Sequence, residues 1–164
     1  MPLHLGVPRV FRFLGVALLC AGSAMAQAPA ANPLRVGLIG PFTGGSADFG
    51  APMLNGVQLA VDEINAVGGY LGRPIELVIR DDKANPDEGL KHSQELVKAG
   101  VTATIGFCNT GVAAKALDTF QTARSPLIIP CSTGTPLTSK FPAPESYIFR
   151  TSARDAIQAP FVVE

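Results

Sequence analysis

Three segments rich in glycine and small hydroxyl residues are the parts of this sequence best suited to hold a ligand. They are residues 40–50 (GPFTGGSADFG), 106–111 (GFCNTG) and 130–135 (PCSTGT). Each follows a short apolar segment that we predict to be a β-strand. Because the carboxyl ends of parallel strands meet at one edge of a sheet, where ligands bind, we expect the three segments to form one site.

The residue types in these segments suit a small carboxylate that also carries a polar or amino group. Thr110 is expected at a helix N-terminus, where free N–H groups and the helix dipole attract a carboxylate. The hydroxyls of Ser132 and Thr133 can donate to a carboxylate or accept from an ammonium. Backbone carbonyls near Cys131 can accept from an ammonium, and Phe49 is suited to cover the apolar part of the ligand.

The same composition has a simpler interpretation, which stays open. Gly, Ser and Thr are common in turns and helix caps, and Asn109 or Thr110 is the expected N-cap of the helix that follows. Any one segment is explained as well in this way. The convergence of three such segments on one edge is what favours a ligand site.

Signatures of an enzyme, a metal site or a cofactor site are absent from the sequence. His92 is expected on the surface of the second helix, away from the strand ends, and no Cys/His pair is available for a nucleophile. Neither a GxxxxGK[ST] nor a GxGxxG motif occurs, and no His/Cys/carboxylate cluster has metal-ligand spacing. Asp81 and Asp82 are expected to be a solvated pair beside a helix. The sequence therefore predicts a protein that is not an enzyme.

Strand and helix patterns alternate along the chain, and the strands are almost continuously apolar. The predicted strands are residues 34–39, 75–80, 101–106, 127–129 and 147–150. A first helix has a stripe made of Leu54, Val57, Val61 and Ile64, and ends at Gly68. A second begins at Asn85 as N-cap, followed by Pro86 and by Glu88 as a possible capping partner. This order predicts an α/β fold with a doubly wound parallel sheet that is covered on both faces.

The first 26 residues read as an export signal. Arg9 and Arg12 precede an apolar core, and Ala24-Met25-Ala26 is a small-x-small cleavage site, so we expect cleavage after Ala26 and a periplasmic protein. Residues 27–33 would be an Ala/Pro tether, and residues 34–164 the folded domain. Since the sequence ends within an apolar segment, we expect that domain to be the first lobe of a longer protein.

Charge and cysteine content exclude some classes of partner. The chain has 13 Lys/Arg and 13 Asp/Glu, and it carries no basic patch for nucleic acid. Cys108 and Cys131 remain after the predicted cleavage. If the strands that precede them are neighbours, a disulfide is sterically possible, and two free thiols are equally plausible.

In the order and spacing of its motifs, the sequence resembles the periplasmic solute-binding proteins of branched-chain-amino-acid ABC importers, which have the type I periplasmic binding fold. The resemblance covers residues 34–164. Six short motifs carry it. They are residues 39–44 (IGPFTG), 60–65 (AVDEIN) within the helix 56–69, Asp81-Asp82, 105–106 (IG) with 109–113 (NTGVA), Pro130 with Ser132-Thr133, and 149–151 (FRT).

The resemblance implies two α/β lobes joined by hinge strands, with the solute held between them, and a membrane permease as partner. It implies that Thr110 binds the α-carboxylate of the solute, and that Thr133 contacts the polar end. Cys131 would contact the solute through its backbone, and Phe49 would flank it. Asn109 and Ser132 complete the candidate set.

This sequence departs from the family pattern at three positions. In the pattern of the family, a serine stands in place of Thr110 and a tyrosine in place of Phe49. It also has a disulfide cysteine where Ala84 stands, so that bridge cannot form here. The resemblance thus implies capture of an amino acid or a related small carboxylate or amide, and leaves side-chain specificity open. A ligand-sensing receptor domain of the same fold, an exported enzyme with catalytic residues elsewhere, and a non-functional fragment remain alternatives.

Overall fold

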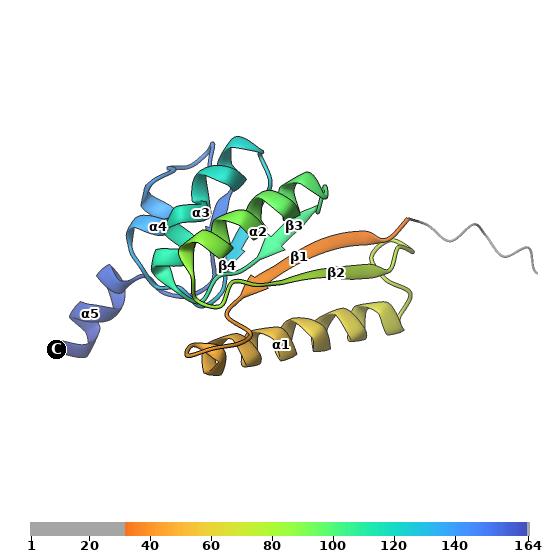
Figure 1. The fold of residues 1–164 in the computed structure, drawn as a ribbon, viewed down its shortest axis with the longest axis horizontal. Coiled ribbons are helices and arrows are strands. Elements are labelled where there is room, and N and C mark those ends of the chain that lie inside the picture. The colour runs from red at the N-terminus through yellow and green to blue at the C-terminus, as the bar shows by residue number, and fades with distance from the viewer. Residues whose placement is uncertain (1–31, 164) are drawn as a thin grey trace, which may run out of the picture.

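Five parallel β-strands form the centre of the fold (Figure 1). The computed structural model describes residues 32–163. The predicted signal peptide and residues 27–31 of the predicted tether lie outside this range. Each strand pairs with its neighbours in parallel, in the order β2-β1-β3-β4-β5. The predicted α/β fold with a parallel sheet is therefore confirmed.

Strands and helices alternate along the chain as predicted. The strands are β1 (Leu34–Gly40), β2 (Ile75–Asp81), β3 (Ala103–Ile105), β4 (Leu127–Ile129) and β5 (Ile148–Arg150). The helices are α1 (Ala47–Ala66), α2 (Pro86–Lys98), α3 (Thr110–Thr122), α4 (Pro136–Ser139) and α5 (Asp155–Val163). The third strand is shorter than the predicted residues 101–106, because the chain pairs with β1 only over three residues.

The order in which strands are added to the sheet changes direction at β1. From β1 the chain adds β2 on one side and then β3 on the other, so the connections after β1 and β3 leave the sheet on opposite faces (Figure 1). A crevice forms at such a reversal, beyond the carboxyl ends of the two strands. This strand order places residues 41–46 and 106–109 beyond the carboxyl ends of the neighbouring strands β1 and β3.

The hydrophobic core lies between the sheet and the layer made by α2 and α3. Its largest buried side chains include Phe107, Phe120, Leu96 and Leu117. The rings of Phe107 and Phe120 meet edge to face, with centroids 6.4 Å apart, an arrangement that aromatic pairs favour. This face of the sheet is closed from solvent.

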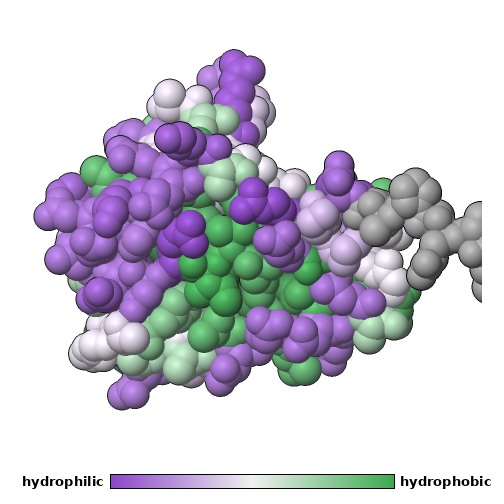
Figure 2. All heavy atoms as spheres, turned by 45° about the vertical axis from the view of Figure 1, so that its right-hand side comes forward, coloured by the Kyte–Doolittle hydropathy of each residue, from purple (hydrophilic) through white to green (hydrophobic). Residues whose placement is uncertain are grey.

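Helix α1 covers the opposite face less completely than predicted. Of the expected stripe, Val61 is buried, Leu54 and Val57 are half-buried, and Ile64 is 38% exposed. Figure 2 shows apolar side chains gathered in the middle of one face, bordered by polar ones. Ile64, at the far end of the predicted stripe, stays partly exposed, and the buried residues of α1 are Gly50, Met53 and Val61.

The local signals for α2 are confirmed in part. The side chain of Asn85 accepts hydrogen bonds from the N–H groups of Asp87 and Glu88, at 2.8 and 3.3 Å. The reciprocal bond of a capping box is not formed, since the Asn85 N–H donates to the carbonyl of Asp82 instead. Within residues 32–163, no helix is both long and apolar enough to cross a membrane.

Candidate functional site

The carboxylate of Asp81, at the end of β2, holds the connection between β1 and α1. Its Oδ1 accepts from the N–H groups of Phe42, Thr43 and Lys83, and its Oδ2 accepts from the Thr43 hydroxyl. Burial raises the pKa of Asp81, but the hydrogen bonds from Thr43, Lys83 and Phe42 outweigh it, so the pKa lies below its ordinary value. The glycine-rich segment is thus pinned to the sheet at its first turn.

The predicted segment 40–50 is not wholly a loop. Helix α1 begins at Ala47, so Phe49 lies in the first helical turn and not in a loop. The expectation that residues 47–50 are irregular is wrong, because the backbone at Ser46 starts the helix although no side chain caps it. The Phe49 side chain is 68% exposed and is free to contact a ligand.

The segments that follow β3 and β4 contact each other directly. The Thr110 hydroxyl accepts a hydrogen bond from the N–H of Gly134 at 3.3 Å. A Cβ added at Gly134 would overlap with the Thr110 side chain, so only glycine permits this approach. On the other side, the Asn109 amide donates to the Ser46 hydroxyl at 3.3 Å. The structure therefore brings the three predicted segments together at one edge of the sheet.

The amino end of α3 is open to a ligand, in contrast to that of α2. Asn109 occupies the N-cap position of α3 but its side chain makes no capping hydrogen bond, whereas the Asn85 side chain closes the end of α2. Thr110, the first residue of α3, is exposed. The N–H groups of the first turn of α3 and the helix dipole are thus available to an anion.

Ser132 and Thr133 lie in different environments. Ser132 is 1% exposed, and its hydroxyl donates to the carbonyl of Phe107 at 3.0 Å. That hydroxyl is used to join the segments after β3 and β4. Thr133 is half-buried, its carbonyl accepts from the N–H of Asp155 at 2.9 Å, and its hydroxyl makes no hydrogen bond within the described chain. Of the two, Thr133 has the side chain that is available to a ligand.

Cys131 and Cys108 are free thiols, both half-buried. The Cys108 thiol donates to the carbonyl of Phe49 at 3.5 Å. Burial raises the pKa of Cys108 above its ordinary value, and contact with the Cys131 side chain raises it further. Cys108 is therefore a neutral thiol near pH 7, and it is not an activated nucleophile.

Asp82 contradicts the prediction of a solvated acidic pair. It is 0% exposed, its Oδ1 accepts from the N–H of Ala84 at 2.8 Å, and its Oδ2 has no partner. Burial raises the pKa of Asp82 to about 6, and the neighbouring Asp81 adds to this. The prediction failed because the chain turns inward after β2, a tertiary feature that a run of two acidic residues does not reveal.

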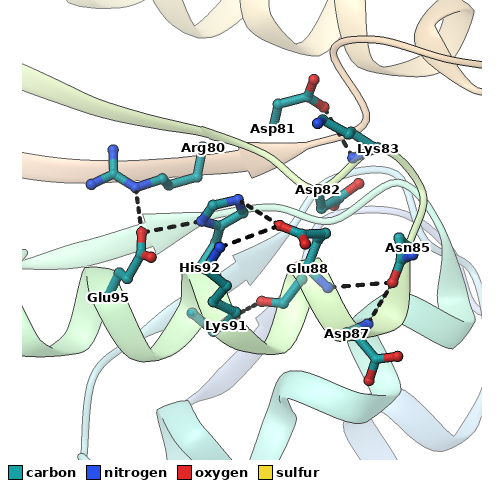
Figure 3. A network of polar contacts seen from close by, with 12 residues as sticks. Arg80, Asp81, Asp82, Lys83, Asn85, Asp87, Glu88, Lys91, His92 and Glu95 are labelled. Carbon is teal, nitrogen blue, oxygen red and sulfur yellow. Dashed lines mark hydrogen bonds and ion pairs between the residues drawn. The ribbon is translucent and has the colours of Figure 1, made fainter.

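His92 was expected on the surface, and the structure shows it half-buried along α2. Its ring lies 3.4 Å from the carboxylate of Glu88 and 3.1 Å from that of Glu95, which also pairs with Arg80 at 3.0 Å (Figure 3). Hydrogen bonds from His92 and Arg80 lower the pKa of Glu95. These contacts use both ring nitrogens of His92 within the helix surface and leave it apart from the strand-end segments.

Ser46, Gly134 and Asp81 border the candidate site in roles that the sequence did not reveal. Each acts across the chain, Ser46 on Asn109, Gly134 on Thr110 and Asp81 on the segment after β1. The fact that Asp81 directly follows an apolar strand was the one local signal available. A hollow of about 650 Å³, lined by Gln121, Pro126, Glu145 and Tyr147 among others, lies at the amino ends of β4 and β5, the edge opposite to the candidate site.

Comparison with known proteins gives one consistent result. A family model described as periplasmic binding protein matches residues 33–164. The chain is 34% identical to the Leu/Ile/Val-binding protein BraC3 of Rhizobium johnstonii over 138 residues, which are 84% of this chain and 37% of that protein.

Solved structures with the same arrangement include two with bound solutes. One is the branched-chain amino acid transporter substrate-binding protein LivJ of Streptococcus pneumoniae in complex with isoleucine (TM-score 0.72, 33% identity, 80% of this chain and 38% of that one). Another is a solute-binding protein of an ABC transporter from Rhodopseudomonas palustris in complex with 3,4-dihydroxybenzoic acid (TM-score 0.66, 31% identity, 75% of this chain and 32% of that one). The chain spans less than two fifths of the length of each of these relatives.

Proposed function

Because the chain belongs to the periplasmic binding protein family, we propose that it is the solute-capturing component of an ABC importer. Its fold is the type I periplasmic binding fold, seen in the relatives that bind branched-chain amino acids. The proposed solute is a small carboxylate, with leucine, isoleucine and valine as the first candidates. The membrane permease of the importer is the proposed partner.

The open amino end of α3 is the observation that carries this proposal. Uncapped N–H groups beside the exposed Thr110 match a carboxylate, which both isoleucine and 3,4-dihydroxybenzoic acid possess. No lysine or arginine is needed, since the helix terminus supplies donors and positive potential. The carboxylate is therefore the part of the solute that this lobe would recognise.

The other candidate residues take roles around that carboxylate. The Thr133 hydroxyl, free of partners in the described chain, would bind the polar end of the solute. The carbonyl of Cys131 would accept from an ammonium, and the exposed ring of Phe49 would cover the apolar side chain. Asn109 would orient the amino end of α3 through Ser46, and Ser132 would hold the segments after β3 and β4 together.

An aromatic acid is a second candidate solute. The relative from Rhodopseudomonas palustris binds 3,4-dihydroxybenzoic acid at a level of identity close to that of the isoleucine-binding relative. Phe49 suits either an aliphatic or an aromatic group. The ammonium group is the chemical difference between the two candidates, and the experiment below uses it.

The proposed place of action is the periplasm. Residues 1–26 would direct export and be removed after Ala26, residues 27–33 would be a tether, and residues 34–164 would form the N-terminal lobe. Mass spectrometry of the protein isolated from the periplasm tests this directly. An N-terminus at Gln27 supports the proposal, and a retained leader contradicts it.

Isothermal titration of the protein produced from its complete gene tests the solute. Leucine, leucinamide, 4-methylpentanoate and 3,4-dihydroxybenzoate form a matched set. Leucine carries both a carboxylate and an ammonium group, leucinamide lacks the carboxylate, and the other two compounds lack the ammonium. We expect leucine to bind and leucinamide to bind at least ten-fold more weakly, since it lacks the anion. Stabilisation should follow RT ln(1 + [L]/Kd) in a thermal-shift assay.

Two outcomes would contradict the proposal. Equal affinity for leucine and leucinamide would show that the amino end of α3 does not bind the solute carboxylate. Absence of binding to all four compounds at millimolar concentration would remove the assignment to small carboxylates. Tight binding of 3,4-dihydroxybenzoate alone would select the aromatic acid.

A further inference from the structure

Three sulfur atoms from three separate elements meet beneath the candidate solute site. The Sδ atom of Met53, on α1, lies 3.9 Å from the Sγ atom of Cys108 and 4.0 Å from the Sγ atom of Cys131. Cys108 follows β3 and Cys131 follows β4. Met53 is the only methionine after the predicted leader, since the other two are Met1 and Met25. The proposed capture of a solute uses none of these three sulfur atoms.

The register of the sheet holds the two cysteines side by side. Thr104 pairs with Leu127 and Ile105 with Ile128 in neighbouring parallel strands. The segments stay side by side beyond the strands, since the Gly106 N–H donates to the carbonyl of Ile128 at 3.0 Å and the Ser132 N–H to the carbonyl of Phe107 at 3.2 Å. The backbone therefore brings Cys108 and Cys131 close together.

Met53 is fixed just as firmly. It is 8% exposed, and its methyl group fills the space that a Cβ at Gly40 would occupy, at the end of β1. The cysteines are half-buried, and the Cys108 thiol has a hydrogen bond to the carbonyl of Phe49. The Met53 sulfur is thus sheltered from water, the two thiols are partly sheltered, and the sulfur atoms lie together before any ligand arrives.

The two separations from Met53 match the sulfur–sulfur spacing around a three-coordinate metal. In a trigonal arrangement with metal–sulfur bonds of about 2.3 Å, neighbouring sulfur atoms are about 4.0 Å apart. Thiolate and thioether donors favour Cu(I), whereas Ca²⁺ and Mg²⁺ require oxygen ligands. Among residues 32–163 no group of three His, Cys, Asp or Glu side chains is placed to hold a metal, so the cluster lacks the fourth ligand that a structural zinc site needs.

From this geometry we infer that Met53, Cys108 and Cys131 form a trigonal binding site for a soft monovalent metal ion, Cu(I). On binding, both thiols release a proton to the solvent, the two thiolates and the thioether coordinate the ion, and no electron is transferred. The bound group carries one net negative charge. It lies two residues before the amino end of α3, whose dipole favours that charge.

The test is an anaerobic titration of the reduced protein, produced from its complete gene, with Cu(I) in competition with a chromophoric chelator such as bicinchoninate. We expect one Cu(I) per chain, two protons released per ion, and X-ray absorption from three sulfur ligands. Met53→Leu is the matched variant, because it keeps a similar apolar volume and removes the sulfur, at a small cost in stability. It should fold and bind Cu(I) at least ten-fold more weakly.

The cysteine variants define where the ion lies. Cys108→Ser and Cys131→Ser should each abolish binding at the chelator concentration that the parent protein withstands. Unchanged affinity in Met53→Leu would overturn the three-sulfur site, and unchanged stoichiometry in either cysteine variant would place the ion elsewhere. Failure of the reduced protein, with both thiols titratable, to take up Cu(I) would also overturn the inference and leave the cysteines as a dithiol/disulfide pair. The solute titration is a separate measurement, so either proposal can fail alone.

Discussion

The hydroxyl of Thr43 donates a hydrogen bond to the carboxylate of Asp81, with 2.5 Å between the two oxygens. Thr43 follows β1 and Asp81 ends β2, so the bond ties two neighbouring strands at their carboxyl ends. Three N–H groups, those of Phe42, Thr43 and Lys83, converge on the same carboxylate. One side chain therefore shapes the glycine-rich segment that borders the candidate site.

Substitution Asp81→Asn is expected to lower the free energy of unfolding by about 1 kcal/mol, because hydrogen bonds to a charged acceptor are stronger than neutral ones. The pKa of Asp81 is lowered in the folded protein, so this stabilisation is present above pH 4 and is lost as the pH falls through the folded pKa. Urea unfolding at pH 7 and at pH 3 measures both effects. The exposed Asp62→Asn is the control, and an equal loss in that variant would contradict the role of Asp81.

Substitution Asp82→Asn is expected to raise the free energy of unfolding, in contrast to Asp81→Asn. The pKa of Asp82 is raised to about 6 by burial, so the folded state binds the proton more tightly than the unfolded state. Stability should therefore fall as the pH rises from about 4 to about 6, and the loss should persist at higher pH. The variant should abolish this slope and raise the free energy of unfolding at pH 8 by about 2 kcal/mol. If the dependence of stability on pH survives the substitution, it arises from other titratable groups, of which Asp81 and His92 are the nearest.

The two asparagines at helix starts are expected to differ in their effect on stability. Asn85→Ala removes a side chain that accepts from two N–H groups of α2, and should cost about 1 kcal/mol. Asn109→Ala removes a side chain that makes no capping bond, that donates only one bond, to Ser46, and whose buried oxygen has no partner, so it should cost less. Chemical denaturation of both variants checks this, and equal losses would contradict the expected difference.

Gly134→Ala is expected to weaken solute binding at least ten-fold. The added methyl group would overlap with Thr110 and displace it from the amino end of α3. Titration calorimetry with the solute identified above measures the change. Gly56→Ala is the control, because a Cβ there meets no other atom and alanine favours the helix. Full affinity in Gly134→Ala would mean that Thr110 does not contact the solute.

Phe49→Ala is expected to separate binding from stability. A side chain that is 68% exposed adds little to folding, so the free energy of unfolding should change by less than about 0.5 kcal/mol. Solute affinity should fall at least five-fold and be restored by Phe49→Tyr, which keeps the ring. If both variants bind as the parent protein does, the proposed role of Phe49 is wrong.

Local signals in the sequence predicted a large part of the fold. The β4 segment, the Asn85 cap and the glycine that follows α1 depend on neighbours within a few residues, and the structure contains all three. Alternation of apolar strands with helices predicted the parallel sheet. That topology in turn predicted that the segments after β1, β3 and β4 meet at one edge.

Other features depended on contacts that no local pattern contains. The burial of Asp82, the early start of α1 and the exposure of Ile64 follow from how the chain turns and packs in three dimensions. The contact of Thr110 with Gly134 spans 24 residues, and the contacts of Met53 with Cys108 and Cys131 span 55 and 78.

The sequence by itself determined which residue types stand at the strand ends, because strand and helix periodicity is a short-range property. The tertiary structure alone decided which of them touch, since strand order and register bring together segments that are far apart along the chain. An open α3 terminus and three adjoining sulfur atoms are consequences of that order.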